Sequence, residues 1–102
     1  MAPGSGIAGV TGERPLLAID PNVLKREANE DGALLFHPDL NLVKVVNATG
    51  LFIFERLDGR TPLDDIARDL AEVFEITPED AERDAAEFAA ELVRLRMAAE
   101  RG

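Results

Sequence analysis

Apolar and β-branched positions fall in short runs in the first half of the chain and recur at helical spacing in the second half. Residues 23–28 form a short mixed stretch, residues 33–36 an apolar run that stops before Pro38, and residues 40–46 a run rich in β-branched side chains. The turn-rich residues 29–32 contain an Asp-Gly pair, which is typical of a hairpin, here with a loop of about four residues. The pattern predicts three strands in an antiparallel meander.

The second half of the chain carries helix-start signals followed by apolar stripes. The apolar residues between positions 51 and 57 suit one or two helical turns. Thr61-Pro62 predicts a cap and a first-turn proline for a second helix, and Thr77-Pro78 repeats this signal for a third helix of about twenty residues. Behind each signal, apolar residues recur three or four positions apart, as on one buried helix face. These stripes are Leu63, Ile66, Ala67, Leu70 and Phe74, and then Ala81, Ala85, Phe88, Ala89, Leu92 and Leu95.

This order of elements predicts an α+β fold in which a three-stranded antiparallel sheet is followed by a three-helix bundle. A three-stranded sheet is unstable alone in water, so its apolar face must pack against the helices. With 102 residues the chain has room for one domain, expected over residues 14–97. A Gly-rich flexible N-terminal tail of residues 1–13 and a C-terminal tail of residues 98–102 are expected to flank it.

The formal net charge of −9 is concentrated in one third of the chain. Residues 61–91 contain eleven acids against two arginines, whereas the remaining residues carry equal numbers of acids and bases. Such a region repels polyanions such as DNA or an anionic membrane surface. The charge therefore favours a cationic or apolar partner.

The chain contains few side chains that could carry out catalysis or bind a metal. Cysteine is absent and His37 is the single histidine, which excludes disulfides, a thiol nucleophile and cysteine-based metal sites. Asp39 could orient His37 as a general base. No sequence motif links this pair to a nucleophile or a second acid, so the favoured interpretation is that His37 is a turn residue. The carboxylates of the last two helices lack the loop spacing of a calcium site and predict a solvated acidic face.

We therefore expect a protein that is not an enzyme, with no catalytic residue, no metal site and no cofactor. The longest apolar stretch is far shorter than the roughly 18 residues of a membrane helix, and residues 1–13 lack the features of a signal peptide. The expected location is the cytoplasm.

The third predicted strand leaves two interpretations open. Residues 42–46, if unpaired on one side, offer a row of backbone groups to another chain. Lys44 in the middle of the strand is a residue type that discourages uncontrolled strand pairing. The edge is therefore either protected against pairing or a docking edge for an extended peptide. The alanines of the last helix are similarly open to tight helix packing or to a binding groove; they are Ala81, Ala85, Ala86, Ala89 and Ala90.

Four stretches of the chain match a known family signature in order and spacing. Val46-Asn47-Ala48-Thr49-Gly50, then Ile53, then residues 57–66 (LDGRTPLDDI) resemble LNxTGxxIWxLLDGxRTxxEI. Upstream, residues 14–18 (RPLLA) and 32–39 (GALLFHPD) resemble RPxLA and LLYPE-like stretches, and downstream Asp84-Ala85 with Phe88 and Leu92 resembles DVxxFLxxL. Together, over about residues 14–95, the chain resembles the PqqD-like family.

The resemblance implies a winged-helix-like fold and a non-catalytic protein. Members of this family recognise precursor peptides of ribosomally made, modified natural products. The leader of the precursor adds as a further strand on the third strand, beside the last helix, and is presented to a modifying enzyme, often a radical S-adenosylmethionine (SAM) enzyme. Leu57 stands where the quinone-cofactor branch has Cys, so the resemblance implies the family and leaves the peptide, the product and the pathway open.

The resemblance also implies where the peptide binds. The backbone of the third strand would pair with the leader, through Leu42, Val43, Lys44, Val45 and Val46. Apolar leader side chains would enter a groove lined by Phe88, Leu92 and Leu51, and basic leader side chains would be selected by Asp84, Glu87 and Glu91. The alternatives are a winged-helix DNA-binding module, which needs a basic recognition helix that this chain lacks, and a dimerisation module using the same sheet edge.

Overall fold

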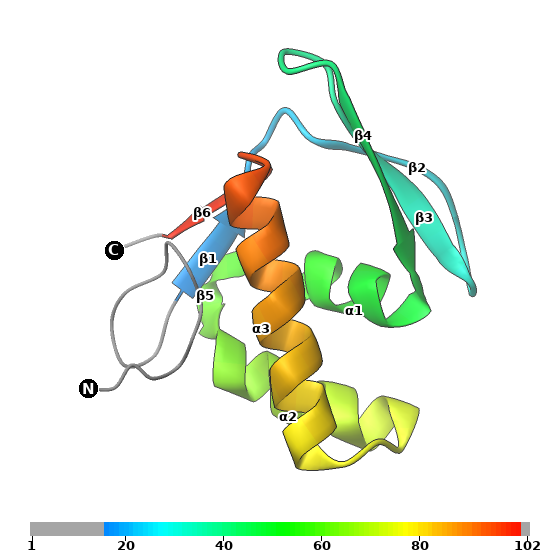
Figure 1. The fold of residues 1–102 in the computed structure, drawn as a ribbon, viewed down its shortest axis with the longest axis vertical. Helices are drawn as coiled ribbons and strands as arrows, with labels where there is room; N and C mark the ends of the chain where they lie inside the picture. The colour runs from blue at the N-terminus through cyan, green and yellow to red at the C-terminus, as the bar shows by residue number, and fades with distance from the viewer. Residues whose placement is uncertain (1–15, 101–102) are drawn as a thin grey trace.

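A computed structural model describes residues 16–100, which form two three-stranded antiparallel sheets and three helices (Figure 1). The elements are β1 (Leu16–Ile19), β2 (Leu24–Asn29), β3 (Gly32–His37), β4 (Leu42–Asn47), α1 (Ala48–Arg56), β5 (Asp58–Pro62), α2 (Leu63–Phe74), α3 (Pro78–Arg94) and β6 (Ala98–Glu100). In Figure 1, α3 runs through the middle of the molecule, with β2, β3 and β4 on one side and β1, β5 and β6 on the other. The fold is α+β, as expected from the sequence.

The predicted meander is confirmed as the sheet β2-β3-β4, in which both strand pairs are antiparallel. The loop between β2 and β3 is shorter than expected, because Glu30 and Asp31 alone separate the two strands. Gly32 makes this turn possible: its φ is +143°, and a Cβ there would lie 2.0 Å from the carbonyl oxygen of Val46 on the neighbouring strand. Only glycine adopts this backbone region readily, and only glycine lets β4 approach this closely.

The second sheet was not anticipated, and it corrects the predicted order of one sheet followed by a helix bundle. Its strand order is β5-β1-β6, and it brings together segments from the start, middle and end of the described chain. Residues 98–100, expected to lie in a C-terminal tail, form β6 and pair with β1. Arg96 adopts a left-handed conformation (φ 63°) at the end of α3, where the N–H of Met97 donates to the carbonyl of Leu92 and turns the chain into β6. The expected tail of residues 1–13 lies outside the described residues.

One of the two predicted helix starts is confirmed and the other is wrong in its cap. Thr77 caps α3, because its side chain accepts a hydrogen bond from the N–H of Asp80 at 3.1 Å, and Pro78 is the first helical residue. α2, however, begins at Leu63, with Pro62 as its N-cap and no side-chain cap bond. Thr61 belongs to β5 instead, where its N–H and hydroxyl donate to the carboxylate of Asp58.

The core lies between α2, α3, α1 and the two sheets. The apolar stripe of α2 is buried through Leu63, Ile66, Ala67 and Leu70, as the periodicity predicts. In α3, Ala81, Ala85 and Ala89 are fully buried, so these small residues serve close packing within the core. No helix within residues 16–100 has the length and apolar character needed to span a bilayer.

Candidate functional site

β4 is an edge strand. Within residues 16–100 it pairs with β3 alone, in register from Gly32↔Asn47 to His37↔Leu42. Because side chains alternate along a strand, Val46 is buried against the core while Val43 and Val45 are 62% and 74% exposed on the opposite face. The strand therefore has one hydrogen-bonding side without a partner strand in the described part of the chain.

A cavity of about 370 Å³ lies beside this edge, between β4, α1 and α3. β4 contributes Lys44, the start of α1 contributes the segment from its cap to Ile53, and α3 contributes side chains one turn apart. The lining residues are Lys44, Asn47, Thr49, Gly50, Ile53, Asp84, Glu87, Phe88 and Glu91. The geometry is an open backbone edge running alongside a polar hollow.

The junction of β4 and α1 shapes this cavity. Asn47 ends β4 and caps α1, accepting a hydrogen bond from the N–H of Gly50 at 2.9 Å, so the strand turns directly into the helix. Gly50 allows α1 and α3 to approach, because a Cβ at this position would lie 3.0 Å from the ring of Phe88. The half-buried Phe88 ring is thereby held against the start of α1 as the apolar part of the wall.

The charges along the cavity are uneven. Glu91 lies 3.5 Å from the Lys44 ammonium across the cavity and also pairs with Arg94 one turn along α3. Partial burial acts to raise the pKa of Glu91, but Lys44 and Arg94 together outweigh it and hold that pKa below its ordinary value. Asp84 and Glu87 form no salt bridge within residues 16–100 and interact with Arg83 only at longer range, so the net negative charge sits at their end of the cavity.

The eleven residues proposed from the sequence are brought together only in part. Five of them line the cavity: Lys44, Asp84, Glu87, Phe88 and Glu91. The other four strand residues lie on β4 itself, whereas Leu51 and Leu92 are core residues, 9% and 0% exposed, and do not line the cavity. The sequence reasoning missed Asn47, Thr49, Gly50 and Ile53 as lining residues, although all four lie in the signature stretch.

His37 is not the turn residue that the sequence suggested. It ends β3, is 3% exposed, and its Nε2 lies 2.9 Å from Oδ2 of Asp20, a partner on the segment after β1, rather than Asp39. The N–H of Asn22 and then His37 hold the pKa of Asp20 below its ordinary value. The pair ties the segment after β1 to the end of β3, which is a structural role.

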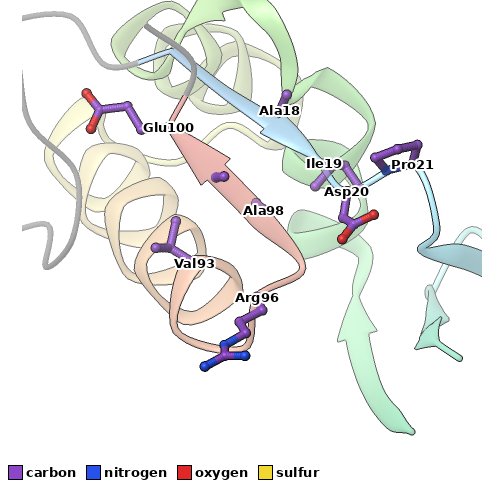
Figure 2. Close-up of a pocket in the computed structure, with 9 residues that line it drawn as sticks. Ala18, Ile19, Asp20, Pro21, Val93, Arg96, Ala98 and Glu100 are labelled. Atoms are coloured by element: carbon purple, nitrogen blue, oxygen red, sulfur yellow. The ribbon is translucent and has the colours of Figure 1, made fainter. Parts of the chain in front are cut away.

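A second hollow, of about 650 Å³, lies on β1 and β6 at the end of α3 (Figure 2). Val93 borders it from α3 and Arg96 from the turn that follows α3, and the carboxylate of Asp20, which also lines it, is already bonded to His37. This hollow shares no lining residue with the cavity beside β4. No cluster of three or more metal-ligating side chains occurs anywhere in the described residues.

Comparison with known sequences gives one family. Residues 32–98 match the profile of the family described as coenzyme PQQ synthesis protein D (PqqD). No curated protein matches the chain significantly. The matched residues run from β3 to the start of β6 and include the open edge, the cavity and all three helices.

Three solved structures share the fold. Lasso peptide synthetase B1 complexed with the leader peptide is 25% identical and superposes with a TM-score of 0.69, covering 81% of this chain and 96% of that one. TbiB1 in complex with the TbiA(beta) leader peptide is 18% identical, with a TM-score of 0.68 over 79% and 93% of the two chains. The PqqD truncation of Methylobacterium extorquens PqqCD is a stand-alone recognition element for ribosomally synthesized and post-translationally modified peptides (RiPPs). It is 19% identical, with a TM-score of 0.65 over 80% of this chain and 86% of that one.

Proposed function

This chain belongs to the PqqD family, and from that premise we propose that it is a non-catalytic adaptor for a ribosomally synthesised precursor peptide. It binds the leader of the precursor by β-strand addition and presents the peptide to a modifying enzyme, of the radical SAM class. It acts in the cytoplasm, where such precursors are made. We also propose that its fold is winged-helix-like.

The observation that carries the proposal is the open edge of β4 running beside the cavity under α3. An extended peptide placed there gains backbone hydrogen bonds from the strand and side-chain selection from the cavity, which is how β-augmentation combines affinity with specificity. The lasso synthetase B1 structure that shares this fold is a complex with a leader peptide.

Each part of the site has a distinct role in the proposal. The backbone of Leu42–Val46 pairs with the leader, and the ring of Phe88 receives an apolar leader side chain. Asp84 and Glu87 select a basic leader side chain, because neither forms a salt bridge in the described residues. Glu91 is already paired with Lys44, while Leu51 and Leu92 support the site from the core.

The proposed charge selection predicts a modest, salt-dependent loss when the free carboxylates are removed. Asp84→Asn combined with Glu87→Gln should weaken binding of a Lys- or Arg-containing leader by about two- to thirtyfold, since exposed ion pairs contribute about 0.2–1 kcal/mol each. Fluorescence anisotropy with a labelled leader peptide at low and at high salt measures this effect.

The matched control neutralises two acids on the exposed side of α2, as Asp69→Asn with Glu72→Gln. This control should bind within twofold of the unmodified protein. Equal losses in both double variants would mean that net charge, and not the cavity, attracts the peptide.

The rival reading as a DNA-binding module predicts the opposite electrostatic behaviour. α2 and α3 both begin with acids, Asp64 and Asp65 in one and Glu79 and Asp80 in the other. We therefore expect no binding to duplex DNA in a gel shift at about 50 mM salt, where phosphate contacts are strongest. Salt-sensitive micromolar binding would replace the adaptor proposal with the DNA-binding one.

A further inference from the structure

The sheet β2-β3-β4 has an apolar outer face that faces away from the core. Strand register arranges this face as two cross-strand rows, one running Leu24–Phe36–Val43 and the other Arg26–Leu34–Val45. Along β3, Ala33, Leu35 and His37 alternate with Leu34 and Phe36 and are buried on the opposite, core-facing side. Five of the six outer residues are apolar.

These outer residues are not covered by the described chain. Leu24, Val43 and Val45 are 38%, 62% and 74% exposed, which makes them three of the four most exposed large apolar side chains within residues 16–100. Leu34 and Phe36 are half-buried beside them and do not pack against the core. Contiguous exposed apolar surface of this kind marks an interaction site more often than a scattered apolar residue does.

The charge of this face differs from that of the helices. Arg26 is the one charged residue in the two rows, and it forms no salt bridge within the described chain. The acids of the molecule are concentrated between residues 61 and 91, on α2 and α3. The acidic helices therefore repel a partner that carries carboxylates, whereas Arg26 attracts a single carboxylate beside the apolar rows.

We propose that this outer face is the docking surface for the modifying enzyme, which meets it with an apolar patch and a carboxylate opposite Arg26. The inference rests on the proposed function. A peptide added along β4 continues the pleat of the sheet, so its alternate side chains lie on the outer face next to Val43 and Val45. The docking surface is thus continuous with the leader, and the enzyme contacts both at once.

The size of the face indicates which form of the adaptor the enzyme recognises. An exposed patch of this kind covers on the order of a few hundred Å², whereas a stable interface needs about 800 Å² from each partner. The apolar patch of the empty adaptor supplies only part of such an interface. The added leader strand enlarges the same face, so the enzyme docks on the loaded adaptor in preference to the empty one.

The test changes the outer face at the strand farthest from the leader. Leu24→Thr with Arg26→Glu alters β2 and leaves β4 untouched, and both substituted residues suit an exposed strand. The matched control is Val73→Thr with Arg60→Glu, which removes an even more exposed apolar side chain (59%) from α2 and reverses an exposed arginine on β5. Two readouts are needed: leader affinity by anisotropy, and kcat/KM for modification of a precursor by a radical SAM enzyme, with candidates for both taken from the genes that flank this one.

The expected result is a leader affinity within threefold of the unmodified adaptor and a loss of tenfold or more in kcat/KM, with the control unchanged in both. Unchanged kcat/KM would overturn the docking surface while leaving the adaptor function intact. A parallel fall in affinity and kcat/KM would also overturn it, because the face would then act in peptide binding. A dimer that dissociates on Leu24→Thr with Arg26→Glu would assign the face to a second copy. Failure of the unmodified protein to bind the leader would instead refute the proposed function.

Discussion

Proline substitutions in β4 are expected to separate peptide binding from folding. In an antiparallel strand, successive backbone N–H groups point alternately to the paired neighbour and to the open edge. Lys44→Pro and Val45→Pro therefore fall in opposite phases, and Val43→Pro repeats the phase of Val45→Pro. One phase loses a ladder bond to β3 and loses stability, whereas the other removes an edge donor and leaves the sheet paired.

The variant that keeps its fold should lose leader binding by tenfold or more. It loses one backbone bond worth about 0.5–1.5 kcal/mol, and the proline ring also obstructs the approach of the peptide. Circular dichroism identifies the folded variant, and anisotropy with the labelled leader measures its affinity. A folded β4 proline variant with undiminished affinity would rule out strand addition at this edge.

Truncation of Leu70 in α2 is the second change with a large expected effect. Leu70 is fully buried between α2 and the rest of the core, so Leu70→Ala removes apolar contacts and leaves a cavity. The expected cost in the free energy of unfolding is about 2–5 kcal/mol. Chemical denaturation followed by circular dichroism measures it directly.

The neighbouring acids provide the control for Leu70. Asp69 and Glu72 are exposed on the other side of α2, so each change to Ala should cost no more than a few tenths of a kcal/mol. A larger loss from either acid than from Leu70 would mean that α2 buries a different face from the one described.

The first sheet and the helices could be predicted because their signals are local. Residues 42–46 include three valines and alternate between less and more exposed positions, and Thr77-Pro78 carries both the cap and the first-turn proline of α3. The second sheet has no such local signal. β1, β5 and β6 have three to five residues each, and β5 contains Gly59 and Pro62, which indicate turns when seen alone. Their strand character comes from pairing between distant segments.

The strand residues of the site could be predicted from the sequence better than the residues that line the cavity. Phe88 and Leu92 lie one turn apart in the same apolar stripe of α3, but Phe88 borders the cavity while Leu92 is buried in the core. Periodicity identifies the stripe and does not say which part of it another element covers. Asn47 and Gly50 enter the site through the tight junction of β4 and α1, which depends on tertiary packing against Phe88.

Addition of a leader peptide to β4 beside α3 can be followed by NMR titration of the isotope-labelled protein with a synthetic leader peptide from a candidate precursor. Chemical-shift changes are expected in residues 42–46 and in residues 84–92 of α3, with Lys44, Asp84 and Glu87 among those affected. Changes centred on His37 or on α2, with β4 unaffected, would contradict it.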